Sequence, residues 1–312
     1  MSFKKVVVAG GGVLGTQIAF QAAYCGFDVT IWLRSESSIG RTKPKIEMIK
    51  KDYLEAIERM ATTKEKWCMG IADPDHFDAE ECKKNVEAAY AGLKLELDMK
   101  KAFLDADVVI ESMTENKEAK LAFYKKAAPL LAPKTVLLTN SSSMLPSTFA
   151  KATGRPDRYL AMHFANEIWL NNIAEVMAQK QTNMKYFDET LQFAKEIRMI
   201  PLPVRKEKAG YLLNSMLIPF LFSAMDLYVL KISEPEAIDT AWVKGTGAPK
   251  GPFQILDVVG LKTAYEIVNA YCKIPSFLAP FHFKLQRDML KSYIDAGKLG
   301  VAAGEGFYKY KN

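Results

Sequence analysis

A glycine run within the first fifteen residues leaves few folds open to this chain. Gly10-Gly11-Gly12-Val13-Leu14-Gly15 matches the pattern G-x-G-x-x-G. It follows the β-branched run Lys4–Ala9 and opens the helix-length segment Val13–Tyr24. A second apolar run follows at Val29–Leu33. This order of strand, glycine turn, helix and strand predicts the first βαβ unit of a parallel sheet.

In this context the glycines predict a dinucleotide site. Gly10 permits the tight turn, Gly12 lets a pyrophosphate approach the backbone, and Gly15 lets helix and strand pack closely. Val13 and Leu14 begin the helix, whose free N–H groups and partial positive charge attract phosphates. The alternative is a glycine-rich turn that binds nothing.

The end of the second strand favours NADP(H) over NAD(H). NAD-specific sites usually carry Asp or Glu there, to hold the ribose 2′-hydroxyl. This chain has Leu33, followed by Arg34 and Ser35. An arginine and hydroxyl groups would pair with a 2′-phosphate that a carboxylate would repel. Alternatively, Arg34 only stacks on adenine and both cofactors work.

Apolar runs along the chain predict an α/β domain followed by a helical one. Further strands are expected at residues 106–110, 135–139, 159–163 and 173–176, with an inserted, solvent-exposed helical pair at about 37–93. Near residue 206 the strand pattern stops. We therefore expect a Rossmann-like domain over 1–206 and an all-helical domain over 207–312, in which Ser233–Glu236 is a capping-box helix start.

Composition excludes several classes of protein. The net charge of +6 on 312 residues comes without a dense basic and aromatic stretch, which argues against nucleic-acid binding. The four cysteines are widely spaced, so neither a metal site nor a disulfide framework is indicated, and a reduced, cytoplasmic setting fits. Polar residues interrupt the apolar stretch 210–230, which predicts a buried helix rather than a membrane span.

His163 is the candidate among only three histidines for acid–base chemistry. It closes a predicted strand, and ligands meet parallel sheets at the carboxyl ends of their strands. Asn140 and the three serines that succeed it follow another strand, and Glu175 lies in a third. A histidine in such a place is otherwise a structural residue.

Eight segments of the chain follow one another in a characteristic order: GGGVLG at 10–15, ESMTENKEAK at 111–120, TNSSSM at 139–144, HFAN at 163–166, AEV at 174–176, AGYLLNSML at 209–217, KGPFQILDVVGL at 250–261 and GEGFYKY at 304–310. In these segments and their order the chain resembles the 3-hydroxyacyl-CoA dehydrogenase family over essentially its full length.

The resemblance implies a role for each matching residue. His163 corresponds to the general base and Glu175 to the carboxylate that orients it. Ser142 and Asn214 correspond to substrate-contacting side chains. The residues implied to contact the cofactor are Glu115, Lys120, Asn140 and Asn166.

The resemblance also implies a homodimer built largely by the helical domain. The structural alternatives are a helix cap for Ser142, a buried hydrogen-bond partner for Glu175 and a polar break in a helix for Asn214.

The expected reaction is hydride transfer between a nicotinamide and C3 of a short-chain 3-hydroxyacyl-CoA. An imidazole with a reference pKa near ~6.5 can take the hydroxyl proton at neutral pH.

Departures from the family pattern bear on the substrate. Common residues at positions expected to border the acyl pocket are replaced by Ala165, Glu167, Trp169, the pair Asn171–Asn172, and Ala209. A non-CoA 3-hydroxy acid or β-keto ester therefore stays open, as does a non-catalytic nucleotide-binding protein. Chain length, direction and stereochemistry also stay open.

Overall fold

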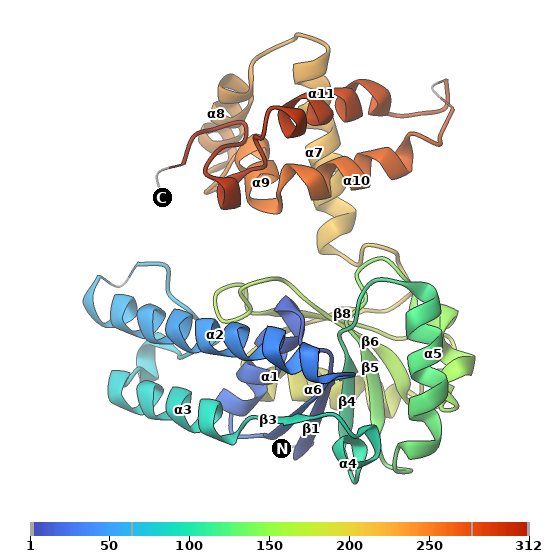
Figure 1. Cartoon of the computed structure of the whole chain (residues 1–312). Coiled ribbons are helices and arrows are strands. Elements are labelled where there is room, and N and C mark those ends of the chain that lie inside the picture. The colour runs from blue at the N-terminus through green and yellow to red at the C-terminus, as the bar shows by residue number, and fades with distance from the viewer. Residues whose placement is uncertain (1–2, 64, 276, 311–312) are drawn as a thin grey trace. The chain divides into compact units, whose positions relative to one another are not determined.

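The chain forms two compact units, Met1–Leu212 and Leu213–Asn312. The computed structural model describes residues 3–63, 65–275 and 277–310 (Figure 1). The division falls after Leu212 rather than near residue 206. The reason is that Tyr211 stays buried in the first unit, in a cluster with Ala161, Met177 and Val204.

An eight-stranded sheet forms the centre of the first unit. Its strands are β1 (Lys5–Ala9), β2 (Asp28–Trp32), β3 (Lys94–Glu96), β4 (Val108–Glu111), β5 (Val136–Thr139), β6 (Tyr159–Phe164), β7 (Ile173–Met177) and β8 (Ile200–Val204). Their order is β3-β2-β1-β4-β5-β6-β7-β8, and every neighbouring pair is parallel except β6 and β7. The expected Rossmann-like sheet is confirmed.

Two strands were not expected from the sequence, and both lie at the sheet's edges. β3 has only three residues and follows a polar helical stretch. β8 reads Ile-Pro-Leu-Pro-Val, and its prolines argue against a strand. An edge strand tolerates proline because its outer N–H groups need no ladder partner.

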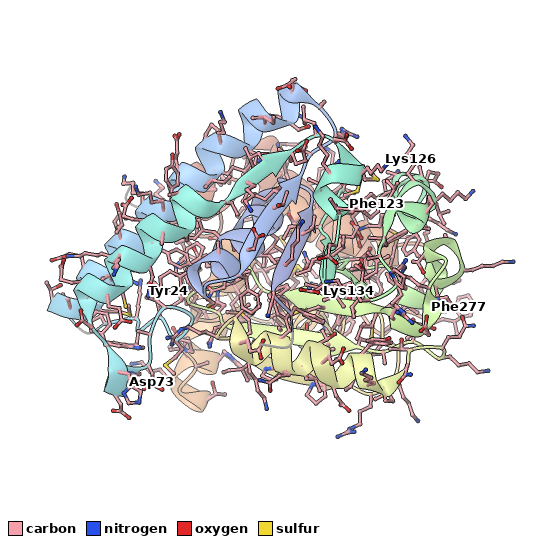
Figure 2. All side chains as sticks on the ribbon, turned by 90° about the horizontal axis from the view of Figure 1, so that it is seen from below. Tyr24, Asp73, Phe123, Lys126, Lys134 and Phe277 are labelled. Atoms are coloured by element: carbon pink, nitrogen blue, oxygen red, sulfur yellow. The ribbon has the colours of Figure 1, made fainter. Side chains whose placement is uncertain are left out.

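Six α-helices accompany this sheet in the described part of the first unit. They are α1 (Val13–Tyr24), α2 (Glu36–Thr62), α3 (Ala79–Gly92), α4 (Met99–Phe103), α5 (Lys117–Ala127) and α6 (Met184–Glu196). On α5, Phe123 is buried whereas Lys126 points outward (Figure 2).

The inserted helical pair is α2 and α3, and it is not simply solvent-exposed. α2 buries one face, in which Ile46, Ile49, Tyr53, Ile57 and Met60 recur at helical spacing. Figure 1 shows α2 and α3 side by side next to α1.

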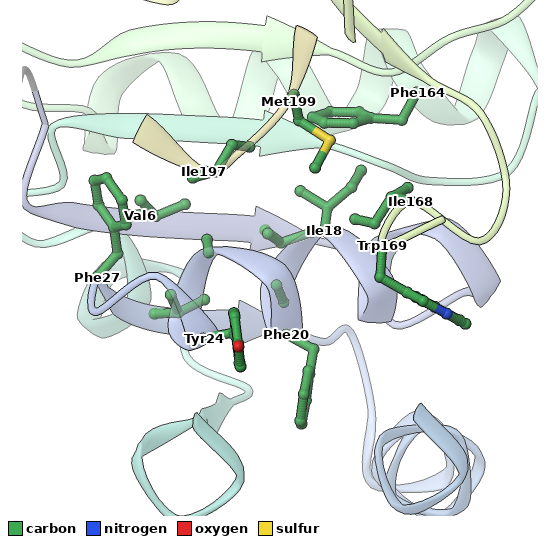
Figure 3. Close-up of a cluster of buried hydrophobic side chains, with 14 of the residues drawn as sticks. Val6, Ile18, Phe20, Tyr24, Phe27, Phe164, Ile168, Trp169, Ile197 and Met199 are labelled. Carbon is green, nitrogen blue, oxygen red and sulfur yellow. The ribbon is translucent and has the colours of Figure 1, made fainter. Parts of the chain in front are cut away.

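The main hydrophobic core surrounds α1, which is buried along most of its length. Ile18 points toward the sheet and Phe20 toward α2 and α3 (Figure 3). The ring of Phe20 packs edge-on against Tyr53, with 5.0 Å between centroids. Burying each such side chain stabilises the fold by about 1.5–3 kcal/mol. The glycine turn at the start of α1 is therefore held on a rigid base.

The second unit is helical. It contains α7 (Leu213–Val229), α8 (Pro235–Thr246), α9 (Pro252–Val259), α10 (Leu261–Tyr271) and α11 (Phe283–Asp295). No helix of the described ranges is both long and apolar enough to cross a bilayer. The expected capping box at Ser233 is wrong: Glu234 is the N-cap of α8 and makes no side-chain cap bond. Instead the backbone N–H of Gly251 donates to the Gln254 side chain at the start of α9.

Candidate active site

The glycine turn between β1 and α1 has the steric requirements that the sequence predicts. Gly10 has φ +128°, and a Cβ there would lie 2.3 Å from the carbonyl oxygen of Ser112. A Cβ on Gly15 would lie 2.1 Å from the carbonyl oxygen of Gly10. A Cβ on Gly12 would have no neighbour within 4 Å. Gly10 and Gly15 are thus needed by the fold, whereas Gly12 leaves open space for a ligand.

A cavity of about 690 Å³ lies over this turn. Its size is within the range of small-molecule and cofactor sites, about 300–1,000 Å³. The expected cofactor residues that line it are Gly10, Gly12, Val13, Leu14, Arg34, Glu115, Asn140 and Asn166. Ser142 also lines it. Gly15, Ser35 and Lys120 are not among its lining residues.

Basic and hydroxyl side chains line the cavity near the end of β2. Besides Arg34, they are Ser38, Arg41, Thr42 and Lys45 of α2. The sequence did not assign these four to the cofactor site, although their spacing of three and four residues places them on one helical face. Ser35 instead joins its hydroxyl to those of Ser37 and Ser38, at 3.1 and 3.0 Å.

Ser142, His163 and Glu175 form a hydrogen-bonded chain. Ser142 Oγ lies 3.0 Å from His163 Nε2, and His163 Nδ1 lies 2.9 Å from Glu175 Oε2. The histidine and glutamate are buried, at 6% and 1% exposure. β6 and β7 set this geometry because their antiparallel register places His163 directly opposite Glu175.

The hydrogen bonds of Glu175 provide the basis for assigning the tautomer of His163. The backbone N–H of Leu212 donates to Oε1 of Glu175 at 2.8 Å, while Oε2 faces the imidazole. With Glu175 ionised, both carboxylate oxygens act as acceptors, and the ring proton of neutral His163 is assigned to Nδ1 on that basis. Nε2 is left with a lone pair toward Ser142, and this arrangement can accept a proton from a hydroxyl group at the cavity.

A polar network holds the loop on either side of Ser142. Glu115 accepts hydrogen bonds from Ser141 Oγ, and from the backbone N–H and hydroxyl of Ser143, at 2.5, 2.9 and 2.8 Å. Burial alone would raise the pKa of Glu115. These bonds and the charge of Lys120 outweigh burial and hold the pKa below its usual value. Glu115 is thus an anion that fixes the loop.

Lys120 lies beneath the cavity rather than in it. The side chain is 1% exposed, and its Nζ donates to both oxygens of Glu111 at 2.7 and 2.8 Å. It also lies 3.4 Å from Glu115. Its charge therefore acts on Glu115 and Glu111, and its expected contact with cofactor stays a prediction.

Asn140 connects β5 to β6 at the cavity wall. Its side-chain oxygen accepts a hydrogen bond from the backbone N–H of Phe164 at 3.1 Å. Asn166 also lines the cavity, and its carbonyl accepts a bond from the side chain of Asn171 at 2.8 Å.

Two of the unusual residues after β6 have partners within the first unit. Trp169 is 8% exposed and packs against Tyr53, with ring centroids 5.1 Å apart. The side chain of Asn172 donates to the carbonyl of Arg198 at 3.0 Å. Trp169 and Asn172 therefore have structural partners of their own, and whether the unusual positions border an acyl pocket stays a prediction.

Asn214 belongs to the helical unit, as the second residue of α7. Its contact with substrate stays a prediction.

Comparison with known proteins identifies the family. The profile described as "3-hydroxyacyl-CoA dehydrogenase, NAD binding domain" matches residues 5–208, and that of the "3-hydroxyacyl-CoA dehydrogenase, C-terminal domain" matches residues 210–310. The chain belongs to the 3-hydroxyacyl-CoA dehydrogenase family. It is therefore an oxidoreductase whose first domain binds a nicotinamide cofactor, which favours an enzyme over the non-catalytic alternative.

Two relatives and one solved structure illustrate the range of similar proteins. The mitochondrial hydroxyacyl-coenzyme A dehydrogenase of Homo sapiens is 31% identical over 99% of this chain and 91% of its own length. The 3-hydroxybutyryl-CoA dehydrogenase of Clostridioides difficile is 28% identical over 98% of this chain and 99% of its own. A solved diketoreductase, whose description concerns dual catalysis of dicarbonyl compounds, is 40% identical, with a TM-score of 0.86 over 99% of this chain and 100% of its own.

The site fits a nicotinamide dinucleotide. The cavity adjoins the first turn of α1, where backbone N–H groups have no intrahelical acceptor. The open space at Gly12 lets a pyrophosphate reach those groups. At the β5 side of the same cavity stands Ser142, which connects it to His163.

Proposed function

We propose that this protein interconverts a short-chain 3-hydroxyacyl-CoA, such as 3-hydroxybutyryl-CoA, and the corresponding 3-oxoacyl-CoA. One observation carries the proposal: the chain Ser142–His163–Glu175 reaches the wall of the cavity that fits the cofactor. The names of the human and clostridial relatives support a CoA thioester as the substrate.

In this mechanism His163 moves the proton that accompanies hydride transfer. As the alcohol is oxidised, its hydroxyl proton passes to Nε2 of His163, and the nicotinamide supplies the hydride acceptor when it is bound. Glu175 holds the opposite nitrogen and favours the imidazolium that forms. Ser142 orients the substrate oxygen, and Asn214 contributes a second substrate contact. In the reducing direction His163 donates the proton.

The cofactor proposal is a preference for NADP(H). Arg34, Arg41 and Lys45 line the cavity beside Leu33, where an acidic residue would select NAD(H). Their charges suit a 2′-phosphate.

Titration of the protein with NADPH and with NADH tests this preference. Arg34→Ala should weaken NADPH binding by about tenfold, the factor that ~1.4 kcal/mol produces, and change NADH binding far less. Lys50→Ala is the matched control, because Lys50 lies on α2 outside the cavity lining and pairs with Glu87 at 2.7 Å. Tighter binding of NADH than of NADPH to the unmodified protein would contradict the proposal.

A second candidate substrate is a non-CoA β-dicarbonyl compound, such as a β-keto ester or 3-oxo acid. The 40% identity to the diketoreductase favours it. Two lysines of α2 that could otherwise meet the phosphates of CoA also have acidic partners: Lys50 pairs with Glu87, and Lys51 lies 3.5 Å from Glu55.

One absorbance assay separates the two substrate classes. Acetoacetyl-CoA and ethyl acetoacetate are each supplied with NADPH and with NADH, and oxidation is followed at the nicotinamide band. The first proposal expects a higher kcat/KM for acetoacetyl-CoA. A higher value for ethyl acetoacetate would transfer the proposal to the second class, and turnover of neither would overturn both.

We further propose a homodimer in a cytoplasmic, reducing setting, in which the helical domain binds substrate and forms the dimer contact. The family resemblance supports the dimer, as do Phe220, Leu227 and Trp242, which line an apolar cavity of about 470 Å³ on the helical unit. All four cysteines are unpaired in the described residues, which supports the setting. A mass of one chain in sedimentation equilibrium would overturn the dimer. Location of the native protein in another compartment would overturn the cytoplasmic setting.

A further inference from the structure

A tyrosine lies flat against the imidazole of His163. The rings of His163 and Tyr211 have centroids 4.4 Å apart and planes 12° from parallel. Both residues belong to the first unit, and Tyr211 is 1% exposed. Neither the motif at the glycine turn nor the hydrogen-bonded chain accounts for this contact.

The hydroxyl of Tyr211 is attached to the loop that carries Ser142. It donates to the carbonyl oxygen of Ser141 at 2.7 Å. Burial raises the pKa of this phenol, so the hydroxyl remains a donor. Ser141 is fixed at two further points, because its N–H donates to Thr139 and its hydroxyl to Glu115.

The backbone at Tyr211 is held in an unfavourable conformation. Its φ is +51°, a region that bulky L-residues rarely occupy. Such a conformation persists only where its surroundings over-determine it. Three contacts supply that restraint: the stack on His163, the hydrogen bond from Tyr211 to Ser141, and the hydrogen bond from the N–H of Leu212 to Glu175. These two consecutive residues thus contact the segments that carry Ser142, His163 and Glu175.

The hydrogen bonds of His163 restrain the plane of its ring only softly. The covalent bond to Cβ and the bonds at Nδ1 and Nε2 define that plane, but hydrogen bonds tolerate a broad range of angles, so the ring can still tilt out of it. A parallel aromatic ring blocks the tilt toward its side. The negative face of the tyrosine ring also attracts the imidazolium cation that forms during alcohol oxidation.

We propose that Tyr211 is a positioning residue, whose ring keeps the imidazole of His163 in the plane needed for proton transfer with Ser142 and substrate. This inference rests on the proposed function of His163 as the proton-transfer group. The aromatic ring restrains the imidazole of His163, and the hydroxyl holds that ring in place through its hydrogen bond to Ser141.

Two substitutions of Tyr211 separate the ring from the hydroxyl. Tyr211→Leu removes both, and Tyr211→Phe removes only the hydroxyl. Tyr24→Leu is the matched control, because Tyr24 is also buried and its hydroxyl also donates to a backbone carbonyl, that of Ile71 at 3.1 Å. We measure kcat, KM and cofactor Kd with the substrate that the unmodified protein turns over.

The expected result is a loss confined to kcat. Tyr211→Leu should lower kcat by roughly 3- to 30-fold, the factor for a stacking interaction with a cation, and leave KM and the Kd for cofactor nearly unchanged. Tyr211→Phe should recover most of the activity, and Tyr24→Leu should retain kcat even if it lowers the melting temperature. Normal kcat in folded Tyr211→Leu overturns the proposal. A loss of kcat in Tyr211→Phe of roughly 3- to 30-fold would also overturn the proposal. If Tyr211→Leu does not fold, the kcat of Tyr211→Phe decides the test.

A nuclear magnetic resonance measurement tests the stack without using activity. With histidine labelled, the ring-current field of Tyr211 should displace the ring protons of His163 upfield, and Tyr211→Leu should remove that displacement while Tyr24→Leu preserves it. An unchanged His163 resonance in Tyr211→Leu overturns the stack.

The variant His163→Gln distinguishes a failure of this inference from a failure of the proposed function. If His163→Gln stays active, the proposed function fails. If His163→Gln is inactive while Tyr211→Leu is fully active, only the role of Tyr211 is refuted.

Discussion

At the scale of single residues, the decisive feature is the pairing of His163 with Glu175 across two antiparallel strands. The sequence pointed to His163 because it closes a strand in a fold that binds ligands at such ends. The direct opposition of Glu175 follows from the β6–β7 register, which no local pattern specifies. The family resemblance supplied Glu175, and the structure supplies the reason that it can act.

The double acceptance at Glu175 makes a specific prediction for Glu175→Gln. A glutamine side chain has one acceptor oxygen, whereas Glu175 accepts from both Leu212 and His163. The variant must leave one of these donors unpaired or reverse the histidine tautomer. We expect kcat to fall by ~10²-fold or more, with cofactor Kd nearly unchanged. Steady-state kinetics and fluorescence titration measure these two quantities, and a kcat close to that of the unmodified protein would count against the tautomer assignment.

Glu115 predicts a pH dependence of stability. Its pKa in the folded protein is lowered, so its contribution is fully present above the unfolded pKa and is lost as pH falls through the folded pKa. The difference in stability between the unmodified protein and Glu115→Gln should therefore be constant from about pH 5.5 to 8 and shrink below about pH 4.5. Urea unfolding at a series of pH values measures it. A difference that grows toward acid pH would show that the sign is wrong.

At the scale of elements, the glycine turn was predictable because its requirements are local. Strand β1, the turn and α1 follow from β-branched residues, three spaced glycines and a helix-length segment. β3 and β8 were missed because their pairing at the sheet edges depends on tertiary context. Arg41 and Lys45 were missed as lining residues because only the packing of α2 shows which of its faces meets the cavity.

Gly15→Ala tests whether the turn and helix α1 need their close approach. The added methyl group would lie 2.1 Å from the carbonyl oxygen of Gly10. Because backbone must move, we expect a loss of about 1–3 kcal/mol in unfolding free energy, together with weaker cofactor binding. Gly92→Ala is the control, since a Cβ at that helical position meets nothing within 4 Å. Equal stability of the two variants in chemical denaturation would contradict the steric argument.

At the scale of the whole molecule, the sequence predicted the type and order of the two units and the family to which they belong. The end of the strand pattern in the sequence predicted a boundary near residue 206. In the structure the first unit extends to Leu212, because Tyr211 packs among residues of β6, β7 and β8. The stack of Tyr211 on His163 could not be predicted, because it depends on a left-handed backbone at a residue type that rarely adopts one.

The two units also carry different parts of the proposed site. Ser142, His163 and Glu175 belong to the first, and Asn214 belongs to the second. The proposed chemistry therefore depends on the whole chain, while cofactor binding depends on residues of the first unit, which line the cavity. A variant of the proton-transfer group should separate the two properties.

The kinetics of His163→Gln test this account most directly. Glutamine occupies a similar volume but cannot act as the base, so kcat should fall by ~10²–10⁴-fold. The Kd for the reduced cofactor should stay within about twofold, because His163 is not among the residues that line the cavity. A folded His163→Gln protein that keeps the kcat of the unmodified protein would contradict the role of the imidazole and with it the proposed mechanism.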